Sequence, residues 1–214
     1  MSIEEKIRAH EEEILSGKMP ADLKQCPKCY GNPESFKSHG LRQRIFYVII
    51  GGFVYRIESF LGRWKCVLCN CTFTYYPDFS LPFKRYPKDS ILPLAEKYVE
   101  ENTTYQEVVQ NDDGSPISFE SSGGDRSLGG STIWRWLDSV GSLKDRLMRA
   151  FDLIRQKSPS STIFREIRPI LSGKYKSESR KILLGFCQRF FIAEAEFKRL
   201  FFISIFPKFA TGFL

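Results

Sequence analysis

Cys26-Pro27-Lys28-Cys29 and Cys66-Val67-Leu68-Cys69 are the two stretches that decide the fold of this chain. In each stretch two residues separate the cysteines, the spacing that lets both thiolates bind one metal ion. The 36 residues between the pairs are rich in β-branched and aromatic side chains, enough for a small antiparallel sheet. Four thiolates form the closed tetrahedral site of a structural Zn²⁺. We therefore predict a zinc ribbon over residues 24–76, with these four cysteines as the ligands.

Two other uses of paired cysteines are disfavoured. Secreted disulfides come with a signal peptide, but the N-terminus is charged and has no apolar segment. A redox pair needs one such motif within alternating strands and helices. Reduced, metal-binding cysteines predict a cytoplasmic, nucleoid-associated protein. No apolar run approaches the 18 residues of a membrane span, so we expect no transmembrane segment.

Two further cysteines lie outside the predicted site. Cys71 offers a fifth thiol beside the second pair. The residue after the last ligand of such a turn often needs a positive φ, which Asn70 tolerates. We therefore keep Cys69 as the ligand and assign Cys71 to the next strand. Cys187 lies among apolar residues, which predicts a buried small side chain.

The positive charge is concentrated around the predicted metal site. The chain has a net charge of +7, of which residues 21–90 contribute +6 from 11 basic and 5 acidic side chains. A basic zinc ribbon indicates a polyanionic partner, and we predict double-stranded DNA. A solvated basic face without a partner is the alternative. The basic residues predicted to contact phosphates are Lys37, Arg42, Arg44, Arg63, Lys84 and Arg85.

The local patterns divide the chain. Helical spacing of apolar residues predicts a helix within 1–20, ended by Gly17 and Pro20. Two β-rich runs at 44–50 and 53–57 flank two glycines, which predicts a two-residue hairpin turn. Residues 72–76 are expected to form the final strand of the ribbon. Prolines mark 77–90 as a basic linker, which either follows a phosphate backbone or packs the ribbon onto the next domain.

The pattern becomes helical over 91–140. Thr104 and Glu107 form a predicted capping box, and 111–130 is a polar, glycine-rich insertion expected to be a mobile loop or small hairpin. In the helix that follows, Thr132 and Arg135 are expected to face outward. Its predicted buried face consists of Ile133, Trp136, Leu137 and Val140. This arrangement indicates a helix-turn-helix whose second helix reads the major groove, although a packed helical hairpin gives the same stripes.

These residues, in this order, resemble the zinc-ribbon and helix-turn-helix region of insertion-sequence transposases and related uncharacterised bacterial proteins. The resemblance covers about residues 24–140. It implies DNA binding directed by sequence, with Thr132 and Trp136 at the recognition helix. The matching segments are the two cysteine pairs, His39-Gly40, the arginines at 42–44, Thr72-Phe73-Thr74, Pro77-Asp78-Phe79 and residues 82–86.

Residues 141–214 are predicted to be helical, without the strands of a transposase catalytic core. With only two histidines far apart in the sequence, we expect no enzyme activity. The predicted fold class is therefore α+β: a small antiparallel zinc ribbon, then an all-α helix-turn-helix and C-terminal helices.

Two alternative functions stay open. The C-terminal phenylalanines could dock a protein partner or a second copy of the chain, or could form the chain's own core. The hairpin tyrosines Tyr47 and Tyr55, beside Arg44 and Arg56, could instead stack on RNA bases.

Overall fold

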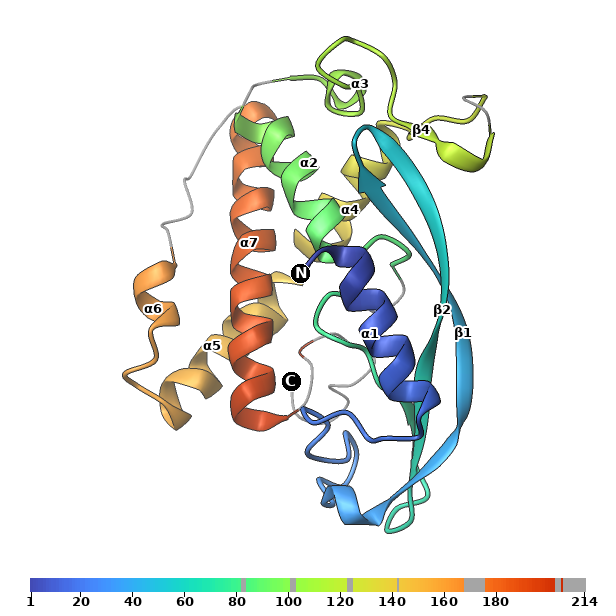
Figure 1. The fold of residues 1–214 in the computed structure, drawn as a ribbon. Coiled ribbons are helices and arrows are strands. Elements are labelled where there is room, and N and C mark those ends of the chain that lie inside the picture. Colours follow the sequence, from blue (N-terminus) through green and yellow to red (C-terminus); the bar gives the residue numbers. More distant parts are fainter. Residues whose placement is uncertain are drawn as a thin grey trace.

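A computed structural model describes residues 1–81, 84–100, 103–122, 125–141, 143–167, 176–202 and 205. The described part combines helices with an antiparallel sheet, which confirms the predicted α+β class (Figure 1). The α-helices are α1 (Ile3–Leu15), α2 (Lys88–Glu100), α3 (Tyr105–Val108), α4 (Ser131–Gly141), α5 (Lys144–Lys157), α6 (Ile163–Glu166) and α7 (Lys176–Phe201). The strands are β1 (Phe36–Ile50), β2 (Phe53–Cys66), β3 (Thr72–Thr74) and β4 (Ser118–Phe119), and two short 3₁₀ helices are η1 (Pro33–Ser35) and η2 (Glu120–Ser122).

One long hairpin forms the frame of the molecule. The predicted two-residue turn is confirmed, because Gly51 and Gly52 link β1 to β2 with φ values of 54° and 81°. Both strands are longer than the sequence predicts. Pairing continues past a bulge at His39-Gly40, where Gly40 takes a φ of 105°, so the segment entering the second cysteine pair is the end of β2.

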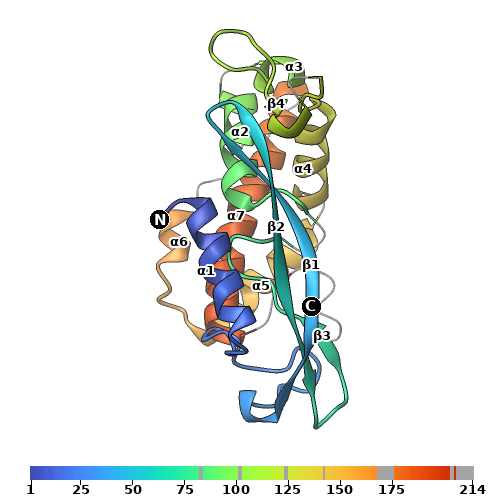
Figure 2. The ribbon, with the colours of Figure 1, turned by 45° about the vertical axis from the view of Figure 1, so that its right-hand side comes forward.

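Three apolar clusters divide this hairpin along its length. Near the turn, Val54 belongs to the core shared with the helices. In the middle, α1 runs beside β2, and its Ile7 shares a cluster with Phe46. At the far end, Trp64 packs with the cysteine-bearing turns. In Figures 1 and 2 one end of the hairpin lies near α3 and β4, and α1 lies beside its other half.

The basic linker lies along the outer edge of β1. The Tyr47 N–H donates to the Arg85 carbonyl at 3.0 Å, and the Ile49 N–H donates to Ser90 Oγ at 3.4 Å. Arg44 Nη2 donates to the carbonyls of Leu81, at 3.5 Å, and Lys84. These contacts cover an edge that would otherwise expose unpaired backbone groups.

The region after the linker is not all-α, so that part of the predicted fold class is wrong. Strand β4 lies within the predicted insertion and pairs in parallel with the start of β2, with Phe53 opposite Ser118. The segment also forms bridges between Gln110 and Pro116 and between Ser118 and Ser127. The polar sequence concealed this pairing because β4 is only two residues long and its partner is far away in the chain.

The C-terminal helix α7 is the centre of the helical part. It contacts α2, α4, α5 and α6. Phe190 and Phe197 are fully buried, and Cys187 is buried as predicted. These side chains therefore contribute to the chain's own core. No helix within the described residues combines the length and apolar character needed to cross a membrane.

Candidate functional site

The four predicted ligand cysteines converge at the far end of the hairpin. Their sulfur atoms all lie within 4.8 Å of one another. Cys26 Sγ is 3.6 Å from Cys69 Sγ, and Cys29 Sγ is 3.6 Å from Cys66 Sγ. A tetrahedral zinc with bonds of about 2.3 Å would separate its sulfur ligands by about 3.8 Å. The spacing therefore fits a metal ion, and it is compatible with zinc.

The backbone around each cysteine pair forms the same kind of loop. The N–H of Cys26 donates to the Gly31 carbonyl at 2.9 Å, and the N–H of Cys66 donates to the Cys71 carbonyl, also at 2.9 Å. In both loops the acceptor follows the first cysteine by five positions. Cys71 therefore contributes its backbone to the second loop and directly precedes β3, without belonging to that strand.

The pKa values of the thiols differ within the cluster of four cysteines. Burial raises the pKa of the Cys26 thiol to about 12. Burial acts in the same direction on Cys66, but hydrogen bonds, including those from the Cys69 N–H and the Ser35 hydroxyl, lower the pKa of its thiol to about 6. Thiolates this close repel one another, so four ionised sulfurs need a cation among them. A divalent metal ion would supply that charge.

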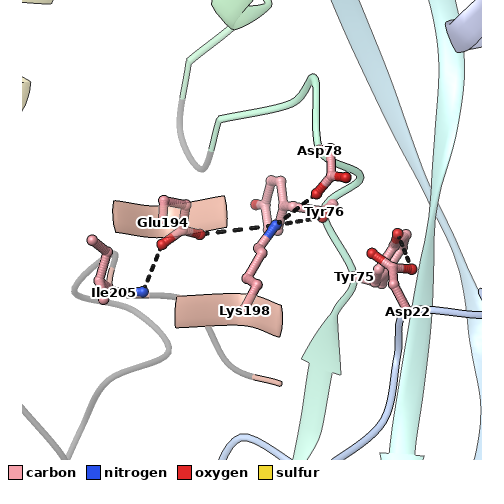
Figure 3. A network of polar contacts seen from close by, with 7 residues as sticks. All are labelled: Asp22, Tyr75, Tyr76, Asp78, Glu194, Lys198 and Ile205. Carbon is pink, nitrogen blue, oxygen red and sulfur yellow. Dashed lines mark hydrogen bonds and ion pairs between the residues drawn. The ribbon is translucent and has the colours of Figure 1, made fainter. Parts of the chain in front are cut away.

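A polar network connects the cysteine-bearing end of the hairpin to α7 (Figure 3). Lys198 Nζ lies 3.4 Å from the Tyr76 carbonyl oxygen and 3.7 Å from Asp78 Oδ1, and nearby the Tyr75 hydroxyl donates to Asp22 Oδ1 at 2.5 Å. A cavity of 490 Å³ lies between α7, the segment before Cys26 and the segment after β3. The cysteine-bearing turns are thereby tied to the helical part through side chains as well as through the hairpin.

Three of the predicted phosphate contacts gather on one face of the hairpin. Lys37 is paired directly with Lys65, and Arg42 is paired with Leu61. Because alternate residues of a strand share a face, the face that carries Leu61 also carries Arg44, which donates to the linker, and four further basic side chains. They are Lys37, Arg42, Arg63 and Lys65, here called the basic strand face. The sequence analysis missed Lys65, because its place opposite Lys37 depends on the register after the bulge.

The basic strand face has no acidic counterpart. Glu58 is the one acidic residue of β1 and β2, and its position in the alternation places it on the opposite face. Within the described part of the chain, none of the four basic side chains takes part in an ion pair. Lys37, Arg42 and Arg63 are exposed and Lys65 is half-buried. Their charges are therefore available to an anion.

The other predicted basic contacts lie against the linker or within it. Arg44 is half-buried with its guanidinium on linker carbonyls, and burial, together with the charges of Arg42 and Arg85, lowers its pKa. Lys84 is half-buried, and burial lowers its pKa, whereas the charge of Asp138 in α4 raises it. Arg85 is exposed. The linker thus carries positive charge from the hairpin to α4.

Helix α4 has the predicted buried face, since Ile133, Trp136, Leu137 and Val140 are all buried. Arg135 is exposed and Thr132 is half-buried. The sequence analysis assigned no role to Trp134, which is 49% exposed beside Arg135. The helical spacing would have found it, because position 134 falls between the buried stripes.

The two hairpin tyrosines do not form one stacking surface. Tyr55 is paired with Val48, the neighbour of Tyr47, so the two rings project from opposite faces. Tyr47 also packs against Phe119, with ring centroids 5.4 Å apart.

Comparison with known proteins finds no matching family model, no similar curated protein and no similar solved structure.

Proposed function

We propose that this chain is a zinc-dependent DNA-binding protein whose metal site fixes the end of the hairpin that carries the basic strand face. It acts as a regulator or recognition subunit rather than as an enzyme. The resemblance to the recognition region of insertion-sequence transposases supports the same role.

One observation carries the proposal: Lys37 and Lys65 lie directly opposite each other across β1 and β2. Like charges in this position repel and destabilise a hairpin by up to about 1 kcal/mol. Arg42 and Arg63 extend the same uncompensated charge along the face. A phosphate backbone would turn this repulsion into favourable contacts, and a two-stranded ribbon fits the width of the major groove.

The metal explains how such a charged face can be held in place. The cluster around the cysteines has few large apolar members, chiefly Leu23, Trp64 and Phe73. A core of this size cannot hold two loops and three strand ends by apolar burial alone. Zinc bound to the four cysteines would supply the missing folding free energy at the end of the hairpin where Lys37 and Lys65 lie.

The decisive experiment uses Lys65→Glu, which replaces the repulsion with a cross-strand ion pair. Hairpin stability and DNA affinity should then move in opposite directions. We expect the unfolding temperature to stay the same or rise, while affinity for duplex DNA falls at least tenfold at low salt. Fluorescence anisotropy with labelled duplex DNA, single-stranded DNA and RNA, at two salt concentrations, measures the affinity.

Lys157→Glu is the matched control, because it makes the same charge change at an exposed position at the end of α5. It should reduce DNA affinity much less than Lys65→Glu. Equal effects of the two variants would show that only net charge matters. Wild-type binding that does not respond to salt would reject the proposal, and tighter binding to single strands or RNA would assign another nucleic acid.

A further inference from the structure

Arg85 in the linker and Arg126 in the insertion each lie over an aromatic ring, and the two rings pack against each other. Arg85 Nη1 also donates to the Tyr47 hydroxyl at 3.5 Å. Arg85 Cζ lies 5.9 Å from the centroid of the Tyr47 ring. Arg126 Cζ lies 4.5 Å from the centroid of the Phe119 ring. The two rings meet edge to face, with centroids 5.4 Å apart and an interplanar angle of 87°. The two stacked arginines are therefore part of one local structure, although 41 positions separate them in the sequence.

Each arginine is also joined to its ring residue through the backbone. The Tyr47 N–H donates to the Arg85 carbonyl at 3.0 Å, and the Phe119 N–H donates to the Arg126 carbonyl at 2.7 Å. The same relationship thus occurs twice, on β1 and on β4. A stacked side chain whose backbone is fixed loses less conformational freedom when it binds a ligand.

Both arginine side chains are exposed to solvent. Arg85 and Arg126 are exposed, whereas Phe119 is buried and Tyr47 half-buried. The charges of both arginines also act on Tyr86. Burial raises the pKa of its phenol to about 12, while the charges of Arg126 and Arg85 both act to lower it. Both guanidinium charges therefore act on the same phenol.

A stacked guanidinium presents its N–H donors at its edge, which suits the oxygen atoms of a phosphate group. We propose that Arg85 and Arg126 form a two-arginine site for backbone phosphates of duplex DNA. This inference rests on the proposed function and extends it from the basic strand face to the linker and the insertion. Arg44 relates the two regions electrostatically, because the charges of Arg42 and Arg85 both act on it.

The test measures how DNA affinity of the full chain depends on salt. Arg85→Gln/Arg126→Gln should reduce the slope of log affinity against log salt by about 1.8, because each phosphate contact contributes about 0.9. Arg85→Lys/Arg126→Lys keeps both charges but loses the planar stacked group. It should retain the wild-type slope and bind about threefold to tenfold more weakly. Thermal unfolding of both variants reports any loss of fold.

The control places the same charge change away from this site. Arg149 and Arg155 are exposed on α5, and Arg155 also stacks on a ring, with its Cζ 5.1 Å from the Phe164 centroid. Figures 1 and 2 show α5 away from β4. Arg149→Gln/Arg155→Gln should leave the salt slope unchanged.

The outcomes separate the two proposals. A wild-type slope in Arg85→Gln/Arg126→Gln, with binding by the wild type intact, overturns the two-arginine site and leaves the basic strand face standing. Wild-type affinity in the double lysine variant overturns the role of stacking. If the double glutamine variant unfolds, the double lysine variant decides, because its backbone hydrogen bonds and charges are kept. A wild type that binds no DNA removes both proposals.

Discussion

Tyr30 and Asn70 occupy the same place in the two cysteine loops and share a left-handed backbone. Each directly follows the second cysteine of its pair, and their φ values are 59° and 55°. The positive φ predicted for Asn70 is confirmed. Tyr30 shows that the first loop imposes the same conformation on a residue that rarely adopts it. The loop geometry therefore overrides the preference of the side chain.

Asn70 should distinguish this backbone requirement from any role of its side chain. Asn70→Gly should leave stability within about 0.5 kcal/mol, since glycine takes a positive φ freely. Asn70→Val should cost at least about 1–2 kcal/mol, because a β-branched side chain is strained there. Denaturant unfolding in the presence of zinc measures both. Equal stabilities of Asn70→Gly and Asn70→Val would contradict the backbone strain expected for valine at position 70.

Removing a ligand should cost the metal and the fold of the hairpin end together. We expect the wild type to hold about one zinc ion per chain, and Cys29→Ser and Cys66→Ser to lose it. Cys71→Ser should keep it, because that thiol is outside the cluster of four. Metal analysis after dialysis, with circular dichroism, checks each variant. Full zinc content in Cys66→Ser would reject the assignment.

The sequence predicted the features that depend on local spacing. The glycine turn and the capping box of Thr104 and Glu107 follow from residues close together in the chain, and the convergence of the cysteines is predicted from the short spacing within each pair. The features it missed depend on contacts between distant segments. Lys65 faces Lys37 only in the register set at the bulge, and Phe119, the ring beneath Arg126, meets Tyr47 only in the folded chain, where β4 pairs with β2.

The two turn glycines should differ although both need a positive φ. A Cβ at Gly51 would meet nothing within 4 Å, whereas one at Gly52 would lie 2.3 Å from Asn111 Oδ1. The Asn111 side chain is held in turn by Ser115 Oγ at 3.0 Å. Gly52→Ala should therefore destabilise the chain by about 1–3 kcal/mol more than Gly51→Ala. Asn111→Ala, added to Gly52→Ala, should recover much of that difference in stability. If it does not, the destabilisation by Gly52→Ala comes from the backbone alone.

His10 should make stability depend on pH. Its ring is buried against Tyr75 and Phe79, and Nε2 has no hydrogen-bond partner among the described residues. Burial lowers its pKa from 6.5 to about 4, so the unfolded chain binds the proton more readily. The stability contributed by neutral His10 is complete above pH 6.5 and is lost as pH falls toward 4.

The matched variant is His10→Phe, which keeps a ring and cannot titrate. Between pH 6.5 and 4 the wild type should lose about 2–3 kcal/mol more than the variant. The comparison cancels the loss of zinc at low pH, which affects both proteins. Parallel stability curves would show that His10 is protonated in the folded state as easily as in the unfolded one.

The last prediction concerns α4, whose tryptophans can report on it directly. Of the three tryptophans in the chain, Trp64 and Trp136 are 6% and 4% exposed, whereas Trp134 is 49% exposed. Acrylamide quenching of tryptophan fluorescence therefore reports mainly on the exposed face of α4. If this face enters the major groove, duplex DNA should protect Trp134 from the quencher.

Two variants separate DNA reading by α4 from its packing. Arg135→Ala should relax the sequence preference by about 1–3 kcal/mol, the discrimination of an arginine at a guanine edge, with little effect on stability. Trp136→Ala should instead destabilise the helical part by about 3–5 kcal/mol, because it removes a buried ring. Selection of bound duplexes from a random pool measures the preference. An unchanged motif in Arg135→Ala, together with unprotected Trp134 in bound wild type, would leave α4 as a packing helix and the basic strand face as the DNA contact.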